Sequence, residues 1–312
     1  MSIGEDGKIE LRSHIKLNKP KRDIRHYALI EHEYLLRMQL DSPRVLAPGN
    51  IYVYKSKLGV EKMSWVCPFY NKTALDVLPA YLEDLNSDEL ILLRPKLPFY
   101  TIELCLDMAL CLKDLHSKNY VHRDIKLENF LVDFDLEAKK VKSCVVSDLA
   151  FCGFLEQFND DKKNIEAKLW SKSFPKKRGD IKKANQKFAS LCKEGSFPSL
   201  DEYKKKYEDD PDGVDLLEFL TKLDQYLIVG TPGHIAPEVY SQRTYSEITD
   251  LYSLGYAFFN LKEQAEAVTF FPSSIEGVCS KLIDSLISTD PGKRPDLDTV
   301  IKTLETMLRK KK

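Results

Sequence analysis

The chain has 312 residues, a hydrophobic content of 43%, a charged content of 30% and a formal net charge of −1. This length suits one large two-lobed domain or two ordinary domains, and this composition excludes a mostly disordered chain. The near-zero net charge excludes a general electrostatic attraction to nucleic acid, so we expect no nucleic acid partner.

Apolar runs and cysteines narrow the class of protein further. The longest mostly apolar run, residues 104–112, contains Asp107 and is far too short to cross a bilayer, so we expect no membrane span. Residues 1–16 are polar and charged, which is unlike a secretory signal. The seven cysteines are scattered without a C-x-x-C pair. This pattern favours a cytoplasmic, reducing compartment over a disulfide framework or a zinc site.

The first predicted elements are a strand and a helix. Apolar and polar residues alternate along residues 8–17, which predicts a strand that carries Lys16 near its end. Apolar residues at three- and four-residue spacings predict a helix over residues 25–40. Glu31 and Glu33 lie about 200° apart around such a helix, so only one of them can face inward. Leu35 lies four positions after Glu31, which favours Glu31, whereas Arg37 lies four positions after Glu33.

The pattern continues through further strands and helices toward a polar loop. The predicted elements are strands at residues 50–54 and 61–68 with a turn near Gly59, a helix at residues 73–85 interrupted by Pro79, and a buried helix at residues 100–117. The second of these strands runs into Cys67 and Phe69. The last helix delivers the chain to the loop described next.

That loop reads His122-Arg123-Asp124-Ile125-Lys126-Leu127-Glu128-Asn129 and carries three chemically complementary groups. The carboxylate of Asp124 can accept a proton from an attacking hydroxyl. The ammonium of Lys126 can neutralise a transferring phosphoryl group, and the amide oxygen of Asn129 can bind a metal ion. This set suits phosphoryl transfer, in which catalysis is mostly positioning and charge stabilisation.

Four more motifs follow the loop in the chain. Residues 130–133 continue as a strand that contains Leu131, a polar hairpin turn is expected over residues 133–142, and an apolar strand then ends at Ser147-Asp148-Leu149-Ala150. The later motifs are Gly230-Thr231-Pro232-Gly233-His234-Ile235-Ala236-Pro237-Glu238, Asp250-Leu251-Tyr252-Ser253-Leu254-Gly255 and Asp290-Pro291-Gly292-Lys293-Arg294-Pro295.

Together these motifs resemble those of eukaryotic-type serine/threonine protein kinases, over residues 8–308 and in family-like order. The loop resembles H-R-D-x-K-x-x-N, and the others resemble D-F-G, A-P-E, D-x-x-S-x-G and a late Arg-Pro element. The resemblance implies an α+β, bilobal protein-kinase-like fold. It comprises a small β-rich N-lobe at residues 1–68, a larger mainly helical C-lobe at residues 69–308 and a basic, frayed tail at residues 309–312.

The resemblance also implies ATP and Mg²⁺ (or Mn²⁺) as cofactors. Asp124 would orient and deprotonate the substrate hydroxyl, and Lys126 would contact the γ-phosphoryl group. Asn129 and Asp148 would hold the metal ion. Lys16 would hold the α- and β-phosphates and be paired with the inward-facing glutamate of the helix. We take this glutamate to be Glu33, because its spacing to residues 43–46 fits the family pattern better than that of Glu31. The residues expected against the nucleotide are Lys16, Cys67, Phe69, Leu131 and Ser147.

A further set of residues is expected to have structural or regulatory roles. In the family, the aspartate of the D-x-x-S-x-G motif bonds the loop backbone, and the late arginine pairs with the Ala-Pro-Glu glutamate. These contacts correspond here to Asp250 with the loop and Arg294 with Glu238. The full set is His122, Arg123, Thr231, Glu238, Asp250 and Arg294.

The sequence departs from the family in three places. Only Gly4 and Gly7 precede Lys16, so the glycine-rich loop that covers the phosphates is degenerate, shortened or missing. Leu149 and Ala150 replace the Phe and Gly of D-F-G. Residues 155–226 form a long insert that is basic in its first half and acidic in its second, either a solvated face or a site for a regulatory partner.

We therefore predict a kinase that transfers the γ-phosphoryl group of ATP to serine or threonine hydroxyls of protein substrates. The serine/threonine assignment rests on Lys126 and Thr231, where tyrosine kinases usually differ. The alternative is a pseudokinase that uses the same fold for binding or scaffolding, and the missing glycine loop and Asp148-Leu149-Ala150 support it. A third hypothesis is a small-molecule kinase. The Ala-Pro-Glu element argues against it, because those enzymes usually lack that element.

Overall fold

The computed structural model describes residues 2–3, 9–16, 33, 36–47, 49–55, 61–154, 228–242 and 244–311. The contact pattern divides the chain into two compact units. The described part of the first unit lies within residues 2–41 and Leu46–Phe69, and that of the second within Ser42–Val45, residues 70–154 and residues 228–311. Gly4, Gly7, Gly59 and the predicted insert lie outside the described residues.

The first unit contains an antiparallel sheet. Its strand order is β1-β2-β4-β3. The strands are β1 (Ser2–Ile3), β2 (Ile9–Lys16), β3 (Asn50–Lys55) and β4 (Glu61–Pro68). The three predicted strands are thereby confirmed, and Lys16 ends β2 opposite Lys62 of β4. In the predicted helix, Glu33 and residues 36–39 are helical.

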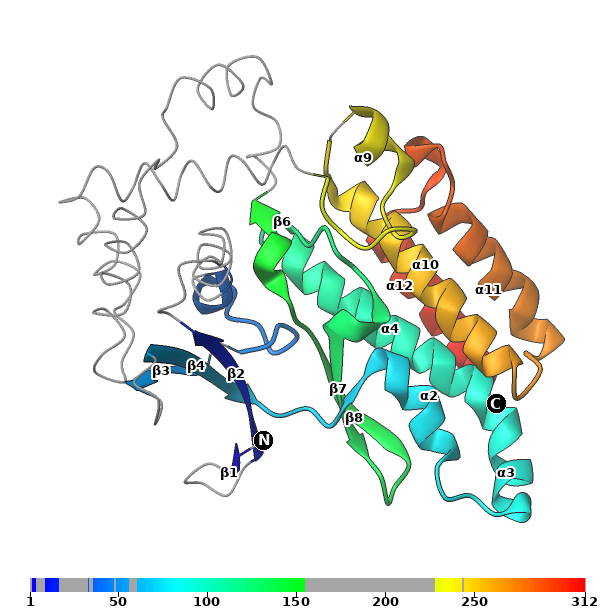
Figure 1. Cartoon of the computed structure of the whole chain (residues 1–312). Helices are drawn as coiled ribbons and strands as arrows, with labels where there is room; N and C mark the ends of the chain where they lie inside the picture. Colours follow the sequence, from blue (N-terminus) through cyan, green and yellow to red (C-terminus); the bar gives the residue numbers. More distant parts are fainter. Residues whose placement is uncertain are drawn as a thin grey trace. The chain divides into compact units, whose positions relative to one another are not determined.

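Four helices of the second unit form a bundle in which each contacts two others. They are α4 (Leu97–His116), α10 (Glu247–Glu266), α11 (Ser273–Leu286) and α12 (Leu297–Leu308). Helix α4 packs against α10 and α12, which both contact α11, and the four run side by side in Figure 1. Helix α4 also packs against strand β8 (Lys140–Val146). It begins three residues before the predicted helix, because Pro98 is tolerated in a first turn and Leu97 is buried.

Helix α2 (Ala74–Leu82) is continuous, so the expectation that Pro79 interrupts it was wrong. Thr73 and Asp76 form a capping box at its start, and the helix runs through Pro79. The proline lies on the exposed face, so it removes one backbone hydrogen bond there, while buried Val77 and Tyr81 hold the helix by packing. Two short helices that were not predicted follow, α3 (Ser87–Leu93) and η1 (Arg94–Lys96).

We expect Pro79→Ala to stabilise the protein. Alanine restores a helical N–H group and removes the ring clash with the preceding turn, a difference of up to about 3 kcal/mol in a helix interior. Loss of proline's restriction of the unfolded chain offsets part of this gain. Urea unfolding of the variant and the wild type measures the difference. A destabilised variant would show that the proline is accommodated without cost.

Small sheets lie beside the bundle. Strands β5 (Lys72–Thr73), β7 (Phe130–Asp135) and β8 form an antiparallel sheet in the order β5-β7-β8, and β6 (Tyr120–Val121) pairs with β9 (Gly153–Phe154). The strands β7 and β8 extend into the predicted polar turn, so residues 136–139 alone connect them. A bulge between Asp133 and Phe134 allows this extension, and the side chain of Asn71 bonds both the N–H and the C=O of Phe134 beside it.

Short elements complete the described part of the second unit. They are η2 (Leu127–Asn129), η3 (Leu149–Phe151), α9 (Pro237–Gln242), η5 (Pro291–Lys293) and η6 (Arg309–Lys311). The last corrects the expected frayed tail, because the backbone continues as a helical turn and the ammonium of Lys310 donates to the carbonyl of Ser274 at 2.9 Å. Across the ranges given above, no helix combines the length and apolar character needed to cross a membrane.

Candidate active site

The polar loop of residues 122–129 lies between β6 and β7 and is held by a buried carboxylate. Asp250, in the first turn of α10, accepts hydrogen bonds from the backbone N–H of His122 at 2.7 Å and of Arg123 at 2.9 Å. The Nε2 of His116, at the end of α4, donates to the same carboxylate at 2.9 Å. The expected bond between Asp250 and the loop backbone is therefore present, and two helices fix where the loop begins.

Asp250 stays ionised in a fully buried position. Burial raises the pKa of a carboxyl group, but the hydrogen bond and charge of His116, together with His122, outweigh burial and hold the pKa of Asp250 below its usual value. An ionised acceptor makes stronger hydrogen bonds to the loop N–H groups than a neutral one. This carboxylate therefore acts as a rigid anchor for the loop.

A second set of contacts joins this loop to Ser147, which lies between the end of β8 and Asp148. The N–H of Asp124 donates to Nδ1 of His122 at 3.2 Å, and Nε2 of the same ring donates to the carbonyl of Ser147 at 2.9 Å. The tautomer with its hydrogen on Nε2 satisfies both contacts. In addition, the N–H of Ser147 donates to the carbonyl of Asn129 at 2.8 Å, and its hydroxyl donates to that oxygen at 3.0 Å. Asp148 thus follows a residue that is bonded at two points to the loop.

At the centre of the site, the carboxylate of Asp124 is held by two side chains. The hydroxyl of Thr231 donates to its Oδ1 at 2.7 Å, and the ammonium of Lys126 lies 2.9 Å from its Oδ2. The same ammonium donates to the hydroxyl of Thr231 at 3.1 Å, which closes a three-residue network. Asp124 is 4% exposed, so this carboxylate is oriented and largely shielded from water.

The network sets the ionisation of both charged groups. Burial raises the pKa of Asp124, but the hydrogen bonds from Thr231 and Lys126 outweigh it, so the pKa of Asp124 is lowered. Burial lowers the pKa of Lys126, but the hydrogen bond and charge of Asp124 outweigh it, so the pKa of Lys126 is raised. Both groups are therefore charged at neutral pH.

We expect Thr231→Val to raise the pKa of Asp124, because the variant keeps the shape but loses the hydrogen bond. In the wild type the folded pKa lies below the unfolded one. This carboxylate therefore contributes stability above its unfolded pKa, and the contribution is lost as pH falls through the folded pKa. In the variant that loss begins at higher pH. Melting temperatures of both proteins between about pH 3 and 7 measure the shift; two parallel curves would contradict it.

Asn129 and Asp148 have the chemistry of a hard-cation site. Nδ2 of Asn129 donates to the carbonyl of Asp124 at 2.8 Å and to its Oδ2 at 3.3 Å, which leaves the amide oxygen Oδ1 as the atom able to coordinate. Asp148 is exposed and takes a left-handed backbone conformation with φ 55°. One amide oxygen and one carboxylate fit Mg²⁺, which usually completes its shell with water and phosphate oxygens. Over the same ranges there is no cluster of three or more His, Cys, Asp or Glu side chains suited to a metal.

Leu149 and Ala150 follow Asp148 in the turn η3, where the resemblance has Phe and Gly. Leu149 is fully buried, so leucine fills an apolar site at this position. Ala150 is half-buried and is not among the residues with positive φ. An alanine is therefore accommodated here without strain.

The arginine of the loop makes contacts that the sequence did not reveal. Its guanidinium stacks on the ring of Tyr245, 4.1 Å from the centroid, and donates to the carbonyl of Phe151 at 3.3 Å. Gly230 lies against the same residue, since a Cβ there would be 2.6 Å from the carbonyl oxygen of Arg123. Tyr245 was missed because its only signal is an aromatic residue five positions before Asp250, and nothing in that spacing names its partners.

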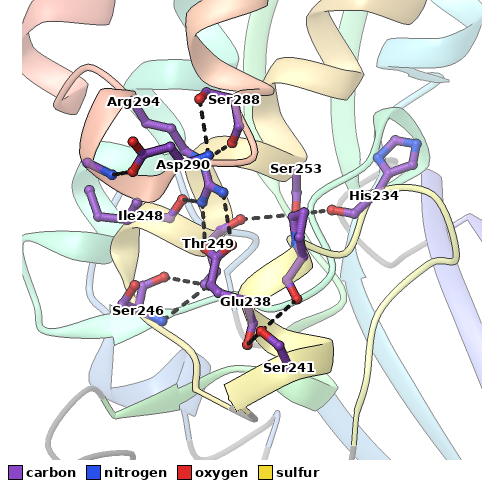
Figure 2. A network of polar contacts seen from close by, with 12 residues as sticks. His234, Glu238, Ser241, Ser246, Ile248, Thr249, Ser253, Ser288, Asp290 and Arg294 are labelled. Carbon is purple, nitrogen blue, oxygen red and sulfur yellow. Dashed lines mark hydrogen bonds and ion pairs between the residues drawn. The ribbon is translucent and has the colours of Figure 1, made fainter.

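The end of the 230–238 motif is fixed by the expected ion pair between Arg294 and Glu238. Two parallel hydrogen bonds join them, Nη1 to Oε1 at 2.6 Å and Nη2 to Oε2 at 2.9 Å (Figure 2). Arg294 also donates to the carbonyls of Ile248 and Ser288, and its side chain is fully buried. In the same network the hydroxyl of Ser253 donates to the carbonyl of His234 at 2.7 Å.

The other predicted residues are found in the first unit and in the small sheet of the second. Glu33 is buried and forms an ion pair with Arg37 of its own helix. The side chain of Lys16 and all of Glu31 lie outside the described residues, so the pairing of Lys16 with Glu33 stays a prediction. Cys67 is buried and Phe69 half-buried in the first unit, and half-buried Leu131 stands opposite Thr73 and Val145 in the small sheet of the second.

Comparison with known proteins points to serine/threonine protein kinases at a distance. The chain is 25% identical over 166 residues to serine/threonine-protein kinase LATS2 of Homo sapiens, 22% over 204 residues to Warts of Drosophila melanogaster and 26% over 155 residues to sax-1 of Caenorhabditis elegans. These matches cover 52%, 64% and 50% of this chain, but 13%, 16% and 25% of the relatives' lengths. The chain thus spans a quarter or less of each relative. No protein-family model matches it.

Proposed function

We propose that the chain is a serine/threonine protein kinase domain that transfers the γ-phosphoryl group of ATP to protein hydroxyls. The observation that carries the proposal is the carboxylate of Asp124, which is ionised, 4% exposed and oriented by Thr231 and Lys126. A general base needs this combination of ionisation and fixed direction. The distant similarity to kinases supports the same chemistry.

Each residue of the network has one task in this reaction. Asp124 accepts the proton of the substrate hydroxyl and directs its oxygen toward the phosphorus. Lys126 places its positive charge beside the transferring group, since its ammonium is already held at that carboxylate. Thr231 keeps both in place. Asn129 and Asp148 would hold Mg²⁺, which neutralises phosphate charge when bound.

The same proposal covers the two lobes, the nucleotide site, the cellular compartment and a regulatory partner. The four-stranded sheet of the first unit and the helical second unit are taken as the two lobes, with Lys16, Glu33, Cys67, Phe69, Leu131 and Ser147 at the nucleotide. The six described cysteines are buried, and the scattered spacing of all seven in the sequence favours a reducing, cytoplasmic setting. The charged residues 155–226 are proposed to bind a regulatory partner.

The rival function is a pseudokinase, which would bind partners without transferring phosphate. The substitution of Leu149 and Ala150 for Phe and Gly favours it. Against it stands the intact network around Asp124, because a scaffold has no need for an oriented and ionised base. The two functions differ in whether metal-bound nucleotide is held for reaction.

Thermal stabilisation by ATP, with and without Mg²⁺, tests the metal site. We expect Mg²⁺ to increase the stabilisation in the wild type and to have little effect in Asp148→Asn, which removes an anionic ligand. Asp133→Asn is the matched control, since it makes the same change at a half-buried position on β7. Stabilisation of the wild type that is identical with and without Mg²⁺ would favour the pseudokinase.

A further inference from the structure

Tyr245 joins two segments that the reaction needs in register. Its hydroxyl accepts a hydrogen bond from the N–H of Val229 at 2.8 Å and donates to the carbonyl of the same residue at 3.0 Å. Its ring lies under the guanidinium of Arg123 at 4.1 Å. Tyr245 is 4% exposed and Val229 8%, so these bonds form away from bulk water, where they hold position well.

The two partners of Tyr245 each lie next to the residues of the central network. Arg123 directly precedes Asp124, and Val229 lies two residues before Thr231. Between them, Gly230 lies close to the loop, since it has φ 113° and no room for a Cβ against the carbonyl of Arg123. Asp124 is therefore linked to Tyr245 along two routes. One runs through Thr231 and Val229, and the other runs through Arg123.

The described residues on either side of 155–227 make contacts at the same place. On one side, β9 pairs with β6, and the carbonyl of Phe151 accepts a bond from Arg123. On the other side, Val229 is bonded to Tyr245. Phe151, Val229 and Tyr245 belong to one apolar cluster, which is completed by Val121, Ile235, Ala236, Val239, Tyr252, Tyr256 and Ile287. The described residues on both sides of 155–227 thus pack in the same cluster as Val121, next to the loop.

We propose that Tyr245 is a positioning residue for the transfer reaction, acting by holding Val229 and Arg123 so that Thr231 stays on the carboxylate of Asp124. We call Arg123, Val229 and Tyr245 the tyrosine clasp. The proposal rests on the proposed function for its effect on turnover. Its structural part, the coupling of Val229 to the loop, stands independently.

Tyr245→Phe tests the clasp because it keeps the ring against Arg123 and removes both bonds to Val229. We expect kcat for transfer to a generic acceptor protein to fall about tenfold, with KM for ATP unchanged, since two hydrogen bonds that position the base are lost. Tyr252→Phe is the matched control. It removes a hydroxyl that bonds to Tyr256 in the same apolar cluster, and turnover should stay at the wild-type level.

A double variant separates positioning from general destabilisation. If Tyr245 acts through Thr231, then adding Tyr245→Phe to Thr231→Val causes little further loss of kcat, because the contact it supports is already gone. A purely structural role predicts that the two losses multiply. Multiplying losses, or an unchanged kcat in Tyr245→Phe, would overturn the proposal.

Hydrogen exchange provides a measurement that does not depend on activity. In Tyr245→Phe, the amides around Val229 and those of residues 120–125 should both exchange faster, whereas Tyr252→Phe should leave both unchanged. Faster exchange around Val229 alone would show that the coupling to the loop does not exist. If the wild type transfers no phosphate, the proposed function fails, and the exchange result still decides whether the clasp positions the loop.

Discussion

Asp124→Asn should reduce phosphoryl transfer by about 10²–10⁴-fold, the usual contribution of a general base. The substitution keeps the size of the side chain, so Thr231 can still bond to it. It removes the proton acceptor and leaves the ammonium of Lys126 without its ionised partner. Binding of ATP should remain close to that of the wild type, because among the described residues this carboxylate bonds to others of the loop and to Thr231.

Single-turnover transfer from γ-labelled ATP measures this effect, and nucleotide titration measures binding separately. Asp298→Asn is the matched control, since it makes the same chemical change at an exposed position on α12. Unchanged turnover in Asp124→Asn would show that Asp124 is not the general base. A parallel loss of binding and turnover would instead indicate that the variant disturbs the whole loop.

Arg294→Leu should destabilise the second unit by about 3–5 kcal/mol, the usual cost of removing one partner of a buried ion pair. The variant leaves the carboxylate of Glu238 without its bidentate partner. It also leaves the carbonyls of Ile248 and Ser288 without the donors that Arg294 provides. Leucine replaces part of the packing against Tyr252 but none of the hydrogen bonds.

Urea unfolding, followed by a probe in the helical bundle, measures the loss. Lys113→Met is a suitable control because it breaks the pair with Asp298, whose side chains are 50% and 77% exposed, and such pairs contribute little. Glu238→Gln should fall between the two, since the amide can still bond to Arg294. A loss for Arg294→Leu no larger than that of the control would contradict the assigned role of the pair.

The contacts that sequence reasoning anticipated share one property. Each of them joins two motifs whose order and spacing are specific to the family. The resemblance therefore names both partners of the contact between Asp250 and the loop backbone, and of the contact between Arg294 and Glu238. Strand β2 was predicted because alternation is a local signal that needs no knowledge of the partner strand.

The contacts that were missed depend on tertiary placement. Tyr245 is an isolated aromatic residue, and its role follows only from the positions of Val229 and Arg123. Likewise, His116 reads as the last residue of an amphipathic helix, and its bond to Asp250 joins two helices far apart in sequence. Helix α3 has no buried residue among its seven, so it lacks the apolar periodicity that predicts a helix.

The expected break at Pro79 was wrong for a different physical reason. A proline rule describes a local cost, and in α2 the packing of the opposite face exceeds that cost. The polar turn of residues 133–142 was predicted too long for the same reason. Composition marks these residues as polar, whereas the ladder between β7 and β8 continues through them with one bulge.

Transfer of label from γ-labelled ATP by the purified protein, with Mg²⁺ and a generic acceptor protein, tests the central claim most directly. We predict label on serine and threonine of the acceptor, dependent on Mg²⁺ and lost in Asp124→Asn. A wild-type protein that binds ATP and Mg²⁺ but transfers no label to the acceptor, to itself or to water would contradict the assignment of Asp124 as a base and leave the pseudokinase as the function.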